Sequence, residues 1–205
     1  MSEQAIKKIL ITGANGFIGG SLMRYYQNQG QDVVGVDLVG NGDDIVKGDI
    51  SQPNSIKQLL TESDVIIHTA ALVSNAMQDS DMWRVNVLAT RNLIQAAKEH
   101  KIRRFVQISS IVAYGNSAEG EIDENHPVHA DGGSYVLTKL ASEHVVLSEQ
   151  ANNDIEVVII RPGDAYGPGS RPWIIAPLEA IAKNQFILPE KGEGFFRPIY
   201  IDDLV

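Results

Sequence analysis

A tyrosine and a lysine four residues apart, Tyr135 and Lys139 in YVLTK, have the types and spacing that acid/base chemistry requires. On a helix this spacing places both side chains on one face, with their Cβ atoms about 5 to 6 Å apart. An ammonium this close to a phenol favours the phenolate, so we expect it to lower the tyrosine pKa from about 10 toward neutral pH. Such a tyrosine serves as a general acid/base for an alcohol or a carbonyl, although the same pair is also common on helix surfaces.

A serine provides a second group for the same chemistry. Ser110 lies in QISSIVAYG, directly after an apolar segment, and 25 residues before Tyr135. At the carboxyl end of a parallel strand, where ligands bind in open α/β sheets, its hydroxyl can hold the substrate oxygen that Tyr135 protonates or deprotonates. The alternative is a serine that caps the turn after the strand.

Three glycines follow the apolar run Ile9-Leu10-Ile11 in ITGANGFIGG. In a strand-to-helix turn of this type, one glycine allows the sharp turn, one lets the backbone approach a pyrophosphate, and one lets the helix pack closely on the sheet. The helix that follows directs its free N–H groups at the phosphates. The turn predicts a dinucleotide site, with a tight ligand-free turn as the alternative, and its binding residues are Gly13, Asn15, Gly16, Phe17, Ile18 and Gly19.

An aspartate at the end of the second apolar segment, Asp37 in DVVGVD, stands 21 residues beyond Gly16. A carboxylate at this place accepts hydrogen bonds from the adenosine ribose diol and repels a 2'-phosphate, which favours NAD over NADP. Asp49 and Ile50 in GDI are expected to frame the adenine, Asp49 through the exocyclic amine and Ile50 by packing. GD is also ordinary turn chemistry.

The elements that must position these residues alternate along the chain. Continuous Val and Ile without polar alternation predicts strands, buried on both faces, at 7–12, 32–37, 65–69, 104–109 and 157–161. Helical patterns lie between them, at 17–29, 53–61, 83–100 and 135–151. This alternation predicts an α/β fold with a doubly wound parallel sheet, the Rossmann fold. The polar stretch 115–133 is expected to be a long loop.

Composition narrows the classes of partner. The 205 residues include 26 acidic and 17 basic side chains, a net charge of -9 that disfavours nucleic acid and anionic membranes as partners. The sequence contains no cysteine, no signal-peptide pattern and no apolar run long enough for a membrane span, so we expect a cytoplasmic protein. His126 and His129 lack acidic neighbours at motif spacing, and we therefore expect no metal site.

Taken together, the stretches ITGANGFIGG, SDVIIHTAA, VNVLATRNLIQAA, RRFVQISSIVAYG, YVLTKLASE and VIIRPGDAYGPG resemble the extended short-chain dehydrogenases/reductases, in particular the NAD-dependent epimerase/dehydratase family that includes UDP-glucose 4-epimerase. The resemblance implies that Ser110, Tyr135 and Lys139 are catalytic, and that Tyr135 and Lys139 also contact the cofactor. It further implies that NAD is contacted by Thr69, Ala70, Ala71, Asn86, Pro162 and Gly163. Arg171 and Arg197 flank the expected substrate region, where the family often uses arginine to hold a substrate diphosphate, and the alternative for each is an ordinary surface residue.

The resemblance implies hydride transfer with Tyr135 as acid/base, most simply epimerisation of a nucleotide sugar. The alternatives are a dehydrogenase or reductase of a hydroxysteroid or ketone, and a protein that binds NAD without catalysis. The related sugar dehydratases have an Asp-Glu pair after the catalytic Ser or Thr, whereas Ile111 and Val112 stand here, which disfavours dehydration.

The resemblance also bears on organisation. We expect an NAD-binding domain over 1–165 and, over 166–205, the beginning of a smaller substrate-binding portion that is truncated, because a helix start at Asp202 and Asp203 is followed by two residues only. Family members often pair two helices in a homodimer, here 83–100 and 135–151. The apolar residues expected on that surface are Val85, Leu88, Val136, Leu140 and Val145.

Overall fold

The computed structural model describes residues 6–73, 78–115, 120–151, 154–194 and 196–205. The chain divides into two compact units, Met1–Arg161 and Pro162–Val205. The assignment of 1–165 to cofactor binding and 166–205 to substrate binding stays a prediction.

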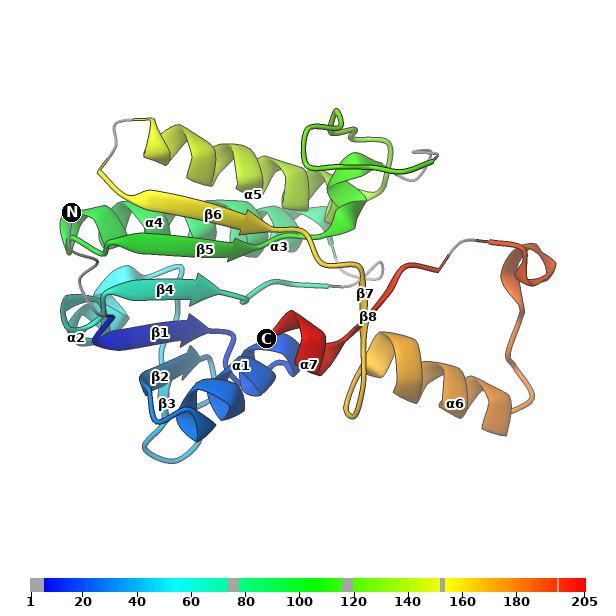
Figure 1. Ribbon diagram of the computed structural model, residues 1–205, viewed down its shortest axis with the longest axis horizontal. Coiled ribbons are helices and arrows are strands. Elements are labelled where there is room, and N and C mark those ends of the chain that lie inside the picture. Colours follow the sequence, from blue (N-terminus) through cyan, green and yellow to red (C-terminus); the bar gives the residue numbers. More distant parts are fainter. Residues whose placement is uncertain (1–5, 74–77, 116–119, 152–153, 195) are drawn as a thin grey trace. The chain divides into compact units, whose positions relative to one another are not determined.

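The first unit is built on a parallel sheet of six strands in the order β3-β2-β1-β4-β5-β6 (Figure 1). The five expected strands form, each within one residue of its predicted ends. β3 was not expected, because it has only three residues and lies between turn residues. The strands are β1 (Lys8–Thr12), β2 (Asp32–Asp37), β3 (Ile45–Lys47), β4 (Val65–His68), β5 (Arg104–Ile108) and β6 (Glu156–Ile160). The expected Rossmann fold is confirmed.

Helices connect the strands where the sequence predicts them. The expected helix at 53–61 forms as a 3-10 turn, Pro53–Ile56, followed by α2. The expected helix at 83–100 forms as a π-helical turn, Trp83–Ala89, followed by α4, and α3 precedes it. The helices of this unit are α1 (Phe17–Asn28), α2 (Lys57–Glu62), α3 (Asp79–Met82), α4 (Thr90–Glu99) and α5 (Ser134–Gln150). The described part of the expected loop is irregular, and residues 116–119 lie outside the described residues.

One continuous hydrophobic layer joins a face of the sheet to α2, α4 and α5 (Figure 1). Leu10, Ile66 and Phe105 supply it from three neighbouring strands, and Leu93 and Val146 supply it from α4 and α5. Right-handed crossovers place α1 on the opposite face, because the chain moves from β1 to β2 in one direction and from β3 to β6 in the other. Because all six strands are parallel, their carboxyl ends lie at one edge of the sheet. At this edge the connections that follow β1 and β4 lead to opposite sides of the sheet.

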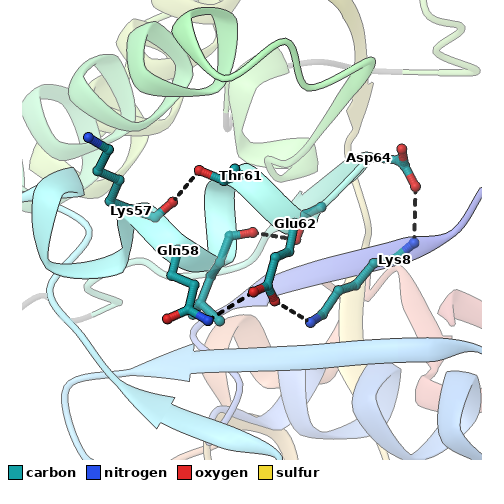
Figure 2. Close-up of polar contacts among 8 residues, drawn as sticks. Lys8, Lys57, Gln58, Thr61, Glu62 and Asp64 are labelled. Atoms are coloured by element: carbon teal, nitrogen blue, oxygen red, sulfur yellow. Dashed lines mark hydrogen bonds and ion pairs between the residues drawn. The ribbon is translucent and has the colours of Figure 1, made fainter.

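Polar contacts hold the opposite, amino-terminal edge of the sheet (Figure 2). Lys8 Nζ lies 2.9 Å from Glu62 Oε2 at the end of α2, and the Lys8 backbone N–H donates to Asp64 Oδ2 at 3.1 Å. Gln58 Nε2 donates to the other oxygen of Glu62 at 2.9 Å. These contacts fix α2 to the start of β1, away from the edge where the candidate site lies.

The second unit contains two short parallel strands, β7 (Asp164–Tyr166) and β8 (Pro198–Tyr200). Between them the chain forms a π-helical turn, Arg171–Ile175, then α6 (Ala176–Ala182) and a 3-10 turn, Pro189–Gly192. α7 (Ile201–Leu204) follows β8, so the helix start expected at Asp202 lies one residue late. In the described residues of both units, no helix has the length and apolar character that crossing a membrane requires.

Candidate active site

The glycine turn lies directly on the loop that follows β4. Gly13 has φ +70°, and a Cβ there would lie 2.7 Å from Ala70 Cα. A Cβ on Gly19 would lie 2.2 Å from Gly13 O, and one on Gly16 would lie 3.0 Å from the same oxygen. Only glycine fits at Gly13 and Gly19, where a Cβ would meet backbone at less than 3.0 Å, and at Gly16 a Cβ would be tightly packed against the same turn.

The turn leaves backbone donors free to bind an anion. The helical hydrogen bonds of α1 begin with Gly20 N–H donating to Gly16 O at 2.8 Å. The N–H groups of Phe17, Ile18 and Gly19 therefore point out of the helix end, where the dipole also favours negative charge. This geometry fits a pyrophosphate.

Asp37 lies beside the glycine turn, as its spacing predicts. Its Oδ2 accepts a hydrogen bond from Asn15 N at 3.1 Å, and its Oδ1 accepts one from Leu38 N at 2.8 Å. Asn15 Nδ2 donates to Val39 O at 2.6 Å, which ties the turn to the chain after β2. The carboxylate is thus held at the end of β2, and its contact with an adenosine ribose stays a prediction.

The GDI segment lies next to Asp37, because Gly48 N–H donates to Asp37 O at 2.8 Å. Asp49 Oδ1 accepts from Ser51 N at 2.9 Å, which is the turn role left open by the sequence. Ile50 is 9% exposed and belongs to the hydrophobic core. An adenine contact by either residue stays a prediction.

The loop after β4 is fixed to the end of β1. Thr69 Oγ1 donates to Thr12 O at 2.7 Å, and Ala70 N–H donates to Thr12 Oγ1 at 3.4 Å. Thr69 and Ala70 therefore lie against the glycine turn, while Ala71 continues the same loop. The cofactor contacts expected for Thr69, Ala70 and Ala71 stay predictions.

Asn86 supports the continuation of this loop from a buried position in the π-helical turn. Its Oδ1 accepts from Leu72 N at 2.7 Å, and its Nδ2 donates to Leu72 O at 3.0 Å and to Thr138 Oγ1 at 3.1 Å. One amide thus binds the loop after β4 to α5. π-helical turns are rare and are frequent at functional sites.

Ser110, Tyr135 and Lys139 converge at the carboxyl end of β5. The Ser110 hydroxyl lies close enough to the Tyr135 phenol to oppose the rise in its pKa. Lys139 Nζ donates to Ile108 O at 3.0 Å and lies 5.9 Å from the centre of the Tyr135 ring. Ser110 Oγ also accepts from Val112 N at 3.3 Å, so it caps the turn and faces Tyr135 at the same time.

The expected effect of Lys139 on the tyrosine is wrong for this structure. Burial raises the pKa of the Tyr135 phenol, and the hydrogen bond from Ser110 offsets the rise only in part. Burial also lowers the pKa of Lys139 to about 8, against the opposing effect of the Glu143 carboxylate. The Lys139 ammonium donates to Ile108 O, and desolvation of the phenol is the largest cause of the raised Tyr135 pKa.

Glu143 is a buried carboxylate that the sequence analysis did not single out. It is 1% exposed, and Arg161 binds it in a bidentate manner, with Nε 3.0 Å from Oε1 and Nη2 2.8 Å from Oε2. Arg161 Nη1 also donates to Tyr114 Oη at 2.8 Å. The four-residue spacing of Tyr135, Lys139 and Glu143 on one helix face is the signal that could have indicated it.

The remaining predicted residues belong to the second unit. Gly163 packs against Arg197, since a Cβ on this glycine would lie 2.3 Å from Arg197 O. Arg171 is exposed and pairs with Glu179, at 3.2 Å between Nη2 and Oε2. The roles expected for Pro162 and Gly163 at the nicotinamide, and for Arg171 and Arg197 at a substrate diphosphate, stay predictions. Among the described residues, no group of three potential metal ligands is found.

Comparison with known proteins agrees with this geometry. Residues 9–205 match the NAD dependent epimerase/dehydratase family. The low-salt glycan biosynthesis protein Agl12 of Haloferax volcanii is 30% identical over 95% of this chain and 69% of its own length. The dTDP-glucose 4,6-dehydratase of Streptomyces niveus is 28% identical over 93% of this chain and 63% of its own length.

A solved structure extends the likeness to three dimensions. UDP-glucuronic acid 4-epimerase from Bacillus cereus, in complex with UDP-glucuronic acid and NAD, superimposes with a TM-score of 0.84 at 28% identity, over 96% of this chain and 70% of that chain. The chain spans 54% to 69% of the length of the curated relatives it matches. The matched residues, the sheet topology and the glycine turn agree, and the chain belongs to the NAD dependent epimerase/dehydratase family.

Proposed function

We propose that this protein is an NAD-dependent epimerase or oxidoreductase that transfers hydride with Ser110, Tyr135 and Lys139, and that its substrate is a nucleotide sugar. The convergence of these three side chains at the carboxyl end of β5 carries the proposal. The glycine turn, the free N–H groups of α1 and the carboxylate of Asp37 fit NAD, which accepts a hydride from the substrate carbon and can return it when bound there.

The side chains divide the proton chemistry among them. Tyr135 Oη removes the proton from the substrate hydroxyl, and Ser110 Oγ holds the same oxygen by a hydrogen bond. Lys139 places a positive charge 5.9 Å from the centre of the Tyr135 ring and orients the β5 end through Ile108 O. Asn86 keeps the loop after β4 in place beside them.

Epimerisation is favoured over dehydration. The turn after Ser110 carries Ile111 and Val112, which have no group that can protonate or deprotonate a neighbouring carbon. A solved relative is a UDP-glucuronic acid 4-epimerase, which supports the same reaction class. A dehydrogenase or reductase that releases the ketone is the second candidate, and a protein that binds NAD without catalysis is the third.

Turnover of UDP-glucose and UDP-glucuronic acid with NAD tests the proposal, with chromatographic separation of the epimers as the measurement. We expect Tyr135→Phe to lower turnover by about 10³-fold or more and to leave NAD affinity within about twofold, because the ring still packs but its transferable proton is gone. Lys139→Ala should lower both turnover and NAD affinity. Ser110→Ala should lower turnover less than Tyr135→Phe does. Release of a ketone with net NADH formation would instead identify a dehydrogenase. Full turnover by Tyr135→Phe would overturn the acid/base assignment.

We also propose that the protein is a homodimer that pairs the helix containing the π-helical turn and α4 with α5. Leu88, Leu137 and Leu147 expose apolar surface on these elements, at 52%, 37% and 45%. Of the residues expected at this surface, Val136 is 7% exposed and Val145 packs against the core, so these two point inward.

A further inference from the structure

His68, the last residue of β4, is a buried polar side chain that the proposed chemistry does not use. It is 1% exposed, and its two ring nitrogens contact two different elements. Nδ1 lies 2.6 Å from Thr12 Oγ1, at the end of β1. Nε2 lies 2.9 Å from Thr90 Oγ1, at the start of α4. The ring therefore bridges the strand that precedes the glycine turn and the helix that follows the π-helical turn.

The neighbouring hydrogen bonds fix which nitrogen carries the proton. Thr90 Oγ1 donates its single proton to Asn86 O at 2.8 Å, so it must accept from His68 Nε2. Nδ1 is then the acceptor, and Thr12 Oγ1 donates to it. The Thr12 hydroxyl can at the same time accept from Ala70 N–H, as the 3.4 Å contact requires. Each hydroxyl and ring proton of Thr12, His68 and Thr90 therefore finds an acceptor only if His68 is neutral and carries its proton on Nε2.

The same hydrogen bonds continue on to the helix of Tyr135. Asn86 Nδ2 donates to Thr138 Oγ1 at 3.1 Å, and Thr138 Oγ1 donates to Tyr135 O at 3.0 Å. Thr90, Asn86 and Thr138 are all buried, at 0%, 3% and 0% exposed. On its other side, His68 reaches Thr12, the residue directly before Gly13.

We propose that His68 is a positioning residue that, as the neutral Nε2–H tautomer, fixes the glycine turn through Thr12 and the Tyr135 helix through Thr90 and Asn86. The Tyr135 side of this inference rests on the proposed function, whereas the Thr12 side concerns NAD binding alone. Burial in a water-excluded place makes each of these hydrogen bonds costly to break, so loss of one partner should be felt at the element it holds.

The first test is the nitrogen spectrum of the histidine rings in the wild-type protein. With ¹⁵N-labelled histidine, we expect one ring to show a protonated Nε2 and an unprotonated Nδ1 and to remain unchanged between pH 7.5 and 5. This set of signals should be absent from the His68→Gln variant, which assigns it. A ring assigned to His68 that titrates in this range, or that carries its proton on Nδ1, would overturn the proposal.

The second test separates the two sides of the ring. Asparagine places an acceptor near the Nδ1 position, and glutamine places a donor near the Nε2 position. His68→Asn should keep the NAD Kd within about twofold and raise the exchange rate of the Leu72 amide, which Asn86 binds, by about tenfold or more. His68→Gln should keep Leu72 protected and raise the NAD Kd about tenfold, the effect of one lost hydrogen bond.

His144→Asn, a change at an exposed position of α5, is the control and should alter neither quantity. If both His68 variants lose NAD affinity and Leu72 protection equally, in proportion to the fall in their thermal unfolding midpoints, the ring only fills space. If neither the NAD Kd nor the Leu72 exchange rate changes, the ring positions neither element. Either outcome would overturn the proposal. If a variant fails to fold, the nitrogen spectrum of the wild-type protein still decides the tautomer on which the proposal depends. Absence of turnover in the wild-type protein would count against the proposed function only, since NAD titration and amide exchange need no sugar substrate.

Discussion

Burial acts on three titratable side chains near the carboxyl edge of the sheet, and in each it disfavours the charged form. The pKa of Tyr135 is raised, that of Lys139 is lowered to about 8, and that of His68 is lowered to about 3. The protein therefore holds a neutral phenol, a cation and a neutral imidazole close to the carboxyl edge of the sheet. A neutral His68 avoids adding a second positive charge near Lys139, whose ammonium contributes to the lowered histidine pKa.

The buried His68 imidazole should make the folding stability of the protein depend on pH in the acid range. The unfolded state binds a proton at His68 near pH 6.5, whereas the folded state stays neutral until about pH 3, so folding stability is lost as the pH falls below about 6.5. This residue contributes a slope of about 1.4 kcal/mol per pH unit. Urea unfolding at pH 6.5 and pH 5 should show the wild-type protein losing more stability than His68→Asn, which has no ionisable ring. Equal losses would mean that His68 is protonated in the folded protein.

The charge of Asp37 should set the choice between NAD and NADP. Asp37→Asn can still accept from Asn15 N but no longer repels a 2'-phosphate, so we expect the Kd for NADP to fall about tenfold while that for NAD rises. Calorimetric titration with both cofactors measures this. Asp32→Asn removes the same charge from the other end of β2 and should leave both constants unchanged. Tighter binding of NADP than NAD by the wild-type protein would refute the role of Asp37.

At the scale of elements, the sequence predicts the strands and turns that have a regular residue pattern. It does not predict elements whose formation depends on contacts with the rest of the fold. Continuous Val and Ile identify the five longer strands, and the glycine spacing together with Asp37 identifies the dinucleotide turn. Periodicity does not reveal that Trp83–Ala89 is π-helical, because the shift of its hydrogen bonds leaves the apolar spacing nearly unchanged. The sequence does not indicate the strands of the second unit, because β7 and β8 have only three residues each.

The site shows the same division. Ser110, Tyr135 and Lys139 follow from residue types and spacing, and the structure brings them together. The tyrosine pKa could not be predicted, because it depends on how much water the folded chain excludes. The buried contacts of His68 and Glu143 depend on partners far along the chain, which no local pattern indicates.

The buried ion pair between Glu143 on α5 and Arg161 at the end of β6 should contribute to the stability of the folded protein. Arg161→Met leaves the Glu143 carboxylate buried without its partner, which we expect to cost about 3 to 5 kcal/mol of unfolding free energy. Arg104→Met, which breaks the exposed pair with Glu156 on β5 and β6, should cost about 1 kcal/mol or less. Chemical denaturation of both variants gives the comparison. Similar losses would show that burial of the Glu143 pair has no special energetic role.

At the scale of the whole molecule, the exposed leucines of the helices predict assembly into a homodimer. If the helices that carry Leu88 and Leu147 pair across a two-fold axis, the double variant Leu88→Asp/Leu147→Asp should be monomeric, because buried carboxylates would face one another at the interface. Light scattering on the wild-type and variant proteins measures the mass directly. Val46→Asp, at a half-exposed position of β3, should leave the mass unchanged. A wild-type monomer would refute the dimer.

The parallel ladder of β7 and β8 has a consequence for how such a protein can diversify. Asp164 pairs with Pro198 and Tyr166 with Tyr200, so the chain between them leaves and returns at one fixed base. Lengthening a loop closed in this way costs little, about 0.6 kcal/mol for each doubling of its length. Insertions and deletions between these two strands can therefore accumulate over evolution without disturbing the ladder, and we expect sequence length among relatives to vary more there than in the six-stranded sheet.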